Sequence, residues 1–176
     1  LLSLADTAEA IRTRKLSSVE ATQALLKRIE QWQPHLNAFV RINTNEAMQA
    51  AKAADAALAA SGPKGPLHGV PLAHKDMYYI AGQPAGCGSK IREGWIAPST
   101  STAIARLENA GAIRIGALHM AEFAYGPTGH NAYLGPARNP WDPLHITGGS
   151  SSGSGAAVAA RLTYAALGSD TGGSIR

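Results

Sequence analysis

Residues 148–176 read GGSSSGSGAAVAARLTYAALGSDTGGSIR, and this stretch is the most informative part of the chain. Its first eight residues are all Gly or Ser. The alanine-rich part at 155–163 predicts a helix, and the apolar residues 164–167 predict a short strand. A second Gly-rich segment follows at 168–176. The stretch therefore predicts a helix and a strand held between two loops.

The remainder of the chain shows the same alternation of helices and strands. Ser17 and Glu20 form a capping-box pattern before a helical repeat, and Pro34 marks its expected end. Further helices are predicted at 43–60 and 99–109, and strands at 39–42, 67–73 and 112–118. Such alternation predicts an α/β fold with a largely parallel sheet flanked by helices. The long connections at 82–98, 126–153 and 168–176 are candidates for functional loops.

The glycines divide the chain into two unequal parts. All 19 glycines lie at or after Gly62, as do nine of the ten prolines. This distribution excludes a collagen-like or linker-like chain, in which Gly would be periodic or diffuse. We expect residues 1–62 to form a helical layer and residues 63–176 to form an α/β core, together one domain.

Composition and charge narrow the class of protein further. Hydrophobic residues make up 45% of the chain and charged residues 16%, which is enough to build a core. The net charge is +4, but the basic residues are scattered, so no nucleic-acid partner is predicted. No apolar run reaches the roughly 20 residues of a membrane-spanning helix. A single cysteine, Cys87, allows no intrachain disulfide and fits a cytoplasmic protein. The histidines form no metal-binding motif, and no metal is expected.

Several short motifs overlap in the Gly/Ser cluster, and none is complete. Gly148 and Gly153 have the spacing of a phosphate-binding loop, but Ser154 stands where that loop has its lysine. Ser151 lies in a G-x-S-x-G pattern, but no histidine follows it to complete a hydrolase triad. A non-catalytic nucleotide-binding or interaction domain stays open as one alternative.

Three blocks taken together are more specific than any of these motifs. They are the Gly/Ser block with its alanine-rich continuation (148–159), the Gly-rich block at 168–176, and the segment GVPLAHKD at 69–76. In their order along the chain, with 69–76 first, 148–159 second and 168–176 last, they resemble the amidase signature family, serine hydrolases of carboxamides with a Ser–cis-Ser–Lys triad. The N-terminal helices and the segment at 135–142 also resemble family segments. The resemblance implies a mixed sheet flanked by helices, and neither metal nor cofactor.

The resemblance also implies roles for individual residues. The nucleophile would be Ser174, the bridging cis-serine Ser150 and the base Lys75. The oxyanion loop would comprise Thr171, Gly172, Gly173 and Ser174.

Further residues would support this group. Ser151, Asp170 and Arg176 would brace the site, with an ion pair between the last two. The substrate would be approached by Ala124, Tyr125 and Gly126. Two positions depart from the family: Ser152 replaces the more usual Gly, and His74 precedes the lysine where a small or apolar residue is commoner.

The chemistry of these residue types agrees with the assignment. A serine hydroxyl is a weak nucleophile unless a base lies beside it. A lysine amine acts as a base only when it is neutral, which requires burial. Lys75 follows an apolar run and is therefore a reasonable candidate. An acid facing the amine would keep it protonated, so we expect Asp76 to point elsewhere.

The expected function is hydrolysis of a small linear amide through an acyl-enzyme on Ser174. The alternative within the same family is the A-type subunit of an amidotransferase, which releases ammonia from glutamine and acts with partner subunits. A homodimer is also compatible with the sequence. Family members run to several hundred residues, so we expect this chain to be an N-terminal fragment. If its 176 residues were the whole polypeptide, weak folding and little activity would be expected.

Overall fold

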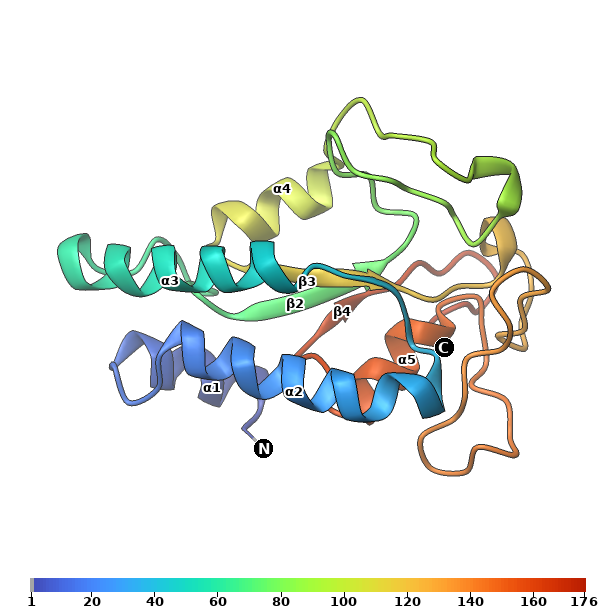
Figure 1. Ribbon diagram of the computed structural model, residues 1–176, viewed down its shortest axis with the longest axis horizontal. Helices are drawn as coiled ribbons and strands as arrows, with labels where there is room; N and C mark the ends of the chain where they lie inside the picture. Colours follow the sequence, from blue (N-terminus) through green and yellow to red (C-terminus); the bar gives the residue numbers. More distant parts are fainter. Residues whose placement is uncertain (1) are drawn as a thin grey trace.

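A computed structural model describes residues 2–176 of the chain (Figure 1). Four strands form one mixed sheet in the order β1-β3-β2-β4. Their bounds are Phe39–Ile42 for β1, Pro71–Lys75 for β2, Ile113–Leu118 for β3 and Ala166–Leu167 for β4. β2 runs parallel to both β3 and β4, whereas β1 runs antiparallel to β3. The predicted α/β fold with a mixed sheet is confirmed.

Five α-helices surround this sheet. They are α1 (Leu4–Arg12), α2 (Ser18–Leu36), α3 (Thr44–Ser61), α4 (Thr102–Asn109) and α5 (Ser152–Ala159). Two single turns of 3-10 helix lie at Lys90–Arg92 and Glu122–Ala124. Figure 1 shows α2 and α5 on one side of the sheet and α4 on the other. The segment 39–42 belongs to the Gly-free part of the chain, yet it pairs with β3, so both parts contribute to one sheet.

The main core lies between the sheet and the layer of α2 and α5. Leu25 and Ile29 from α2 meet Ile115 from β3 and Ala157 from α5, and all four side chains are buried. Ala73 of β2 joins the same cluster. Because side chains alternate along a strand, Lys75 points to the same face of β2 as Ala73. The lysine is thereby directed toward the beginning of α5.

The bounds of several elements differ from the sequence-based prediction for identifiable reasons. Pro34 does not end α2, which continues to Leu36. Proline near the last turn removes only one helical hydrogen bond, and the helix ends where Asn37 adopts a left-handed conformation with φ 47°. Helix α1 was not predicted, although Ser3 and Asp6 form a capping box before it.

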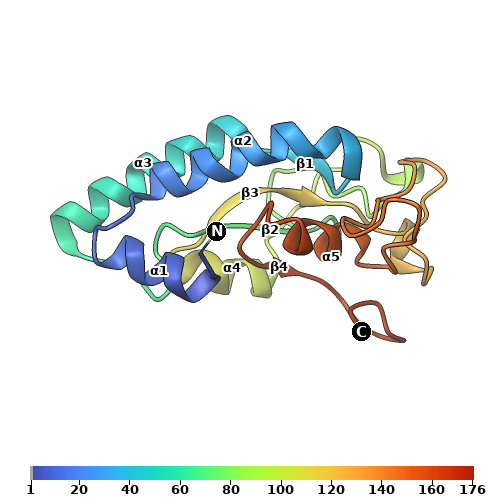
Figure 2. The ribbon, with the colours of Figure 1, turned by 90° about the horizontal axis from the view of Figure 1, so that it is seen from below.

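The bounds of α5 and β2 also differ from the predicted ones. α5 begins at Ser152, three residues before the predicted helix, because the Gly/Ser residues there are themselves helical. β2 covers 71–75 and not 67–73, so Lys75 is its last residue. The segment 168–176 leaves β4 at the edge of the sheet, as Figure 2 shows in dark red.

Candidate active site

Lys75 stands at the end of β2 with its amine buried among serine hydroxyls. Only 1% of the residue is exposed. Its Nζ lies 2.6 Å from Oγ of Ser150, 2.7 Å from Oγ of Ser169 and 3.0 Å from Oγ of Ser151. Burial lowers the pKa of Lys75 to about 8, while the negative charge of Asp170 acts in the opposite direction. A large fraction of the amine is therefore neutral near pH 8.

Ser150 is fully buried just before α5. The peptide bond that joins it to Gly149 is cis, at the position where the family resemblance implies a cis-serine. The Ser150 carbonyl accepts a hydrogen bond from the amide of Ala121 at 3.1 Å. A Cβ on Gly149 would lie 2.7 Å from the Gly129 nitrogen and 2.8 Å from the Gly126 oxygen. Only glycine fits at position 149, because both obstacles are backbone atoms.

The loop at 170–176 is folded around the carboxylate of Asp170. This group accepts hydrogen bonds from the amides of Gly173, Ile175 and Arg176, at 2.8, 3.2 and 3.2 Å. The Arg176 guanidinium adds two further bonds, at 2.9 and 2.7 Å. The expected ion pair between Asp170 and Arg176 is present. The guanidinium, together with these amides, holds the pKa of Asp170 well below its usual range.

These bonds divide the four amides of the predicted oxyanion loop. The Gly173 amide already donates to Asp170 and has no hydrogen left for a substrate. Within residues 2–176, the amides of Thr171, Gly172 and Ser174 have no protein acceptor. Those three amides are therefore available as hydrogen-bond donors.

Ser174 belongs to the same loop, is half-buried, and lines a pocket that is described below. Its carbonyl accepts from the amide of Ser151 at 3.2 Å, which ties it to the residue after Ser150. Its hydroxyl makes no hydrogen bond within the part of the chain that is described. The structure thus brings Lys75 and Ser150 into contact, and it joins the Ser174 backbone to the neighbouring Ser151 while the Ser174 hydroxyl stays unbonded.

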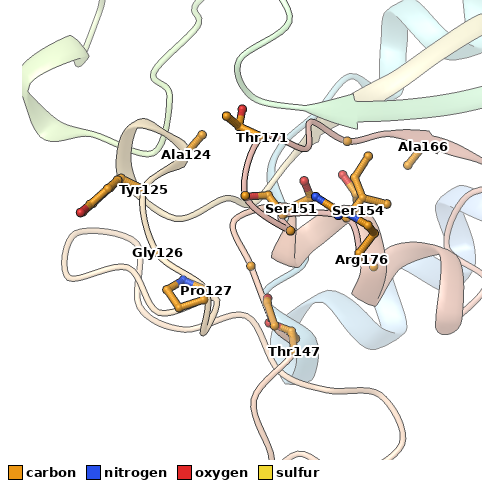
Figure 3. Close-up of a pocket in the computed structure, with 18 of the residues that line it drawn as sticks. Ala124, Tyr125, Gly126, Pro127, Thr147, Ser151, Ser154, Ala166, Thr171 and Arg176 are labelled. Carbon is orange, nitrogen blue, oxygen red and sulfur yellow. The ribbon is translucent and has the colours of Figure 1, made fainter.

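The pocket has a volume of about 970 Å³ and is open to solvent (Figure 3). Its walls come from the segments 124–127, 147–149 and 171–176 and from α5. Ala124, Tyr125 and Gly126, which the family resemblance places near a substrate, all line this pocket. The Tyr125 side chain is 93% exposed and points away from Ser151 in Figure 3.

The two other titratable residues of the GVPLAHKD segment face away from the Lys75 amine. The Asp76 carboxylate accepts from the amide of Gly86 at 3.1 Å, so it points away from the amine as expected. Burial raises the pKa of Asp76 to about 6. His74 points to the opposite face of β2, where burial lowers its pKa to about 4.

Sequence reasoning missed three residues that organise this region. Ser169 contacts the lysine, and the Tyr78 hydroxyl donates to the Gly168 carbonyl at 2.6 Å. His119 lies 2.8 Å from both the Ser152 hydroxyl and the Gly135 carbonyl. Because a carbonyl only accepts, Nε2 carries the hydrogen and Ser152 donates to Nδ1. The departure at Ser152 was a visible signal for this last pair.

Neither a metal-binding cluster nor a membrane-spanning helix is found in residues 2–176. No cluster of three or more His, Cys, Asp or Glu side chains is arranged to hold a metal ion. No helix in this part of the chain is both long enough and apolar enough to cross a membrane.

Comparison with known sequences identifies the family. The amidase family model matches residues 20–176. The A subunit of glutamyl-tRNA(Gln) amidotransferase from Nitrosococcus oceani is 49% identical over 174 residues, which is 99% of this chain and 36% of that protein. The chain belongs to the amidase family, as its three sequence blocks predicted. It spans about a third of the length of the curated relatives that it matches.

Solved structures agree with this assignment. One solved chain is 38% identical to this protein, with a TM-score of 0.95. It belongs to an inhibitor-bound vestigial protein complex that is described as revealing the evolutionary origins of an s-triazine catabolic enzyme. The match covers 99% of this chain and 38% of that one. Fatty acid amide hydrolase is 30% identical with a TM-score of 0.95, and the match covers 99% of this chain and 31% of that one.

Proposed function

We propose that the protein hydrolyses the C–N bond of a small linear carboxamide through an acyl-enzyme on Ser174. The observation that carries this proposal is the contact between the buried amine of Lys75 and the hydroxyl of Ser150, at 2.6 Å. A base of lowered pKa joined to a hydroxyl is the arrangement needed to activate a second serine. Membership of the amidase family supports the same chemistry.

The first half of the reaction forms an ester and releases an amine. The Ser174 oxygen bonds to the amide carbon, while its proton passes to Ser150 and the Ser150 proton passes to Lys75. The negative charge that develops on the carbonyl oxygen is met by the free amides of Thr171, Gly172 and Ser174. Each such donor contributes roughly 3–4 kcal/mol to catalysis. The C–N bond then breaks, and the leaving nitrogen takes the proton back along the same path.

The second half consumes water. A water molecule gives a proton to the same chain of hydroxyls and its oxygen bonds to the ester carbon. The bond to Ser174 breaks, and the serine regains its proton as the carboxylic acid leaves.

The decisive experiment combines a panel of amides and esters with intact-mass measurement. Wild-type protein should turn over at least one substrate and gain the mass of the acyl group. Ser174→Ala should lose the adduct and turnover, and Lys75→Ala should lose turnover. A fluorophosphonate probe should label the wild type and not Ser174→Ala. Absence of both turnover and labelling in the wild type, together with phosphate-dependent thermal stabilisation that survives Ser174→Ala, would support a non-catalytic binding domain instead.

A second candidate is the glutamine-hydrolysing component of an amidotransferase. The observation that favours it is the 49% identity to proteins named as the A subunit of glutamyl-tRNA(Gln) amidotransferase. Such a protein would act with partner subunits. Ammonia release from glutamine that appears only when partner subunits are added would favour this function. Turnover of simple amides without partners would favour the first.

A further inference from the structure

The three hydroxyls around Lys75 are not equivalent, because their hydrogens are used differently. The Ser151 hydroxyl donates to the Ser169 carbonyl at 3.1 Å. Its oxygen accepts from the Ser169 amide at 3.2 Å as well as from Lys75. Ser151 has no second hydrogen to give, so it can only accept from the lysine amine. One N–H of Lys75 is therefore committed to Ser151 in either charge state.

A neutral amine has two N–H groups and one lone pair. Because one N–H is bonded to Ser151, the other N–H and the lone pair remain for Ser150 and Ser169. For catalysis the lone pair must face Ser150, because that hydroxyl delivers the proton. This orientation requires the remaining N–H to point to Ser169. Within the described residues, Ser169 Oγ has no other hydrogen-bond partner. Its oxygen is therefore available to accept that N–H.

We propose that Ser169 is a positioning residue that holds the second N–H of Lys75, so that the amine presents its lone pair to Ser150. The expected effect of Ser169 on kcat rests on the proposed function. The hydrogen bond between Ser169 and Lys75, and its effect on the pKa of the lysine, do not. Ser169 does not line the substrate pocket, so its effect is exerted through Lys75.

The position of Ser169 is fixed by contacts other than that to the lysine. Its amide and its carbonyl are both held by Ser151. The residue before it, Gly168, accepts from the Tyr78 hydroxyl at 2.6 Å. Ser169 thus stays in place whether or not the amine carries a charge, as an orienting group must.

Few charges act on this amine. The loop at 168–176 contributes Asp170, which is itself paired with Arg176. From β2 and the turn after it, Asp76 and His74 face elsewhere and Tyr78 donates to Gly168. The segment entering α5 contributes Ser150 and Ser151, and His119 at the end of β3 is bonded to Ser152 and Gly135. A change at Ser169 should therefore be visible directly in the titration of Lys75.

The first test measures the pKa of Lys75 by NMR of protein labelled with ¹³C-lysine. The Lys75 signal is identified as the one that is absent from the spectrum of Lys75→Arg. Loss of the Ser169 hydroxyl removes an acceptor from the ammonium form, so the pKa of Lys75 should fall by about one unit in Ser169→Ala. Ser169→Thr keeps the hydroxyl and should restore the wild-type value. Ser18→Ala is the matched control, because Ser18 is also buried but its hydroxyl has no partner. An unchanged Lys75 titration in a folded Ser169→Ala protein would overturn the proposal.

The second test is kinetic. With the amine free to turn, kcat in Ser169→Ala should fall by about 10–100-fold with little change in KM. The acidic limb of the pH profile should move down by about the same one unit as the NMR titration. A KM effect with no movement of the pH profile would contradict a positioning role. If the NMR shift occurs and wild type hydrolyses no amide, the proposed function fails while the placement of Ser169 stands.

Discussion

At the scale of the residue, the site depends on one lysine that is buried without a carboxylate partner. An ammonium group in such a place loses hydration, and three hydroxyls replace only part of it. The folded protein therefore disfavours the charged form, which is what a base requires. The burial that would suit Lys75 to the proposed role of base must also lower the free energy of unfolding at any pH at which this lysine is protonated in the unfolded chain.

This argument predicts how stability depends on pH. The pKa of Lys75 is about 8 in the folded protein, against 10.5 for an ordinary lysine. Between these two pH values the unfolded chain therefore binds more protons than the folded protein. The free energy of unfolding should rise as pH increases through this window, by about 3 kcal/mol from this group. Lys75→Met should abolish that rise. Urea unfolding at several pH values between 7 and 10.5 measures it, and parallel pH curves for the two proteins would refute the prediction.

The role of Ser174 as nucleophile stays a prediction. Sequence reasoning did single out Lys75 and Ser150, which the structure brings into contact, because they stand in Gly-rich blocks of recognisable order. It also found the Asp170–Arg176 ion pair, because both residues lie within one short loop. It failed at Ser169, because the role of this hydroxyl depends on which amine it meets from 94 residues away. The commitment of the Gly173 amide to Asp170 was equally invisible, since it depends on how the loop curls.

At the scale of the element, α5 is a helix with two glycines in opposite situations. A Cβ on Gly153 would lie 2.4 Å from the oxygen of Ala38 and 2.4 Å from the nitrogen of His119. A Cβ on Gly155 would meet nothing within 4 Å. The first glycine permits close packing of α5 against the ends of β3 and the loop before β1. The second has no such role and only weakens the helix.

The two glycines form a matched pair for mutation. Gly155→Ala should raise the free energy of unfolding by about 0.5–1 kcal/mol, because alanine is the better helix former. Gly153→Ala should lower it by more than this amount, since backbone atoms must move. Thermal and urea unfolding of both variants measures the difference. Equal effects would show that close packing at Gly153 is not a constraint.

Boundaries of elements were less predictable than their existence. The capping box at Ser17 was recognised correctly, because it is a local pattern. The start of α5 was misplaced, because Ser and Gly at 152–155 have poor helix propensity and are held helical by tertiary packing. The start of β2 was misplaced because residues 66–69 form turns before the strand. β1 was predicted as a strand, but its antiparallel pairing with β3 follows from topology and not from composition.

At the scale of the whole molecule, His119 joins three segments that are distant in sequence. Its amide donates to Ala38, its carbonyl accepts from Gly153, and its ring bonds Ser152 and Gly135. Burial lowers the pKa of its imidazole, which keeps the ring neutral and able to bridge. The long loop at 126–149 is therefore attached to the sheet through a side chain that is completely buried.

Removal of the His119 ring should lower the free energy of unfolding and loosen the attachment of the loop at 126–149. His119→Ala leaves the Ser152 hydroxyl and the Gly135 carbonyl unpaired, and should cost about 2–4 kcal/mol. His119→Gln, which can still donate and accept, should cost less. Hydrogen exchange should also become faster for amides around 129–138 in the alanine variant. Wild-type exchange in that loop would show that other contacts hold it.

The separation of the active-site residues along the chain has a consequence in time. Lys75 and Ser169 are 94 positions apart, so at roughly 5–20 residues per second the ribosome makes the lysine about 5–20 s before the serine. During that interval the amine is hydrated and protonated like any other lysine. Its pKa falls toward 8 only when β2, the start of α5 and the segment after β4 meet and bury the amine. A nascent chain that does not yet include Ser169 therefore carries an ordinary protonated Lys75, and a fall in the pKa of this amine would report that the site has assembled.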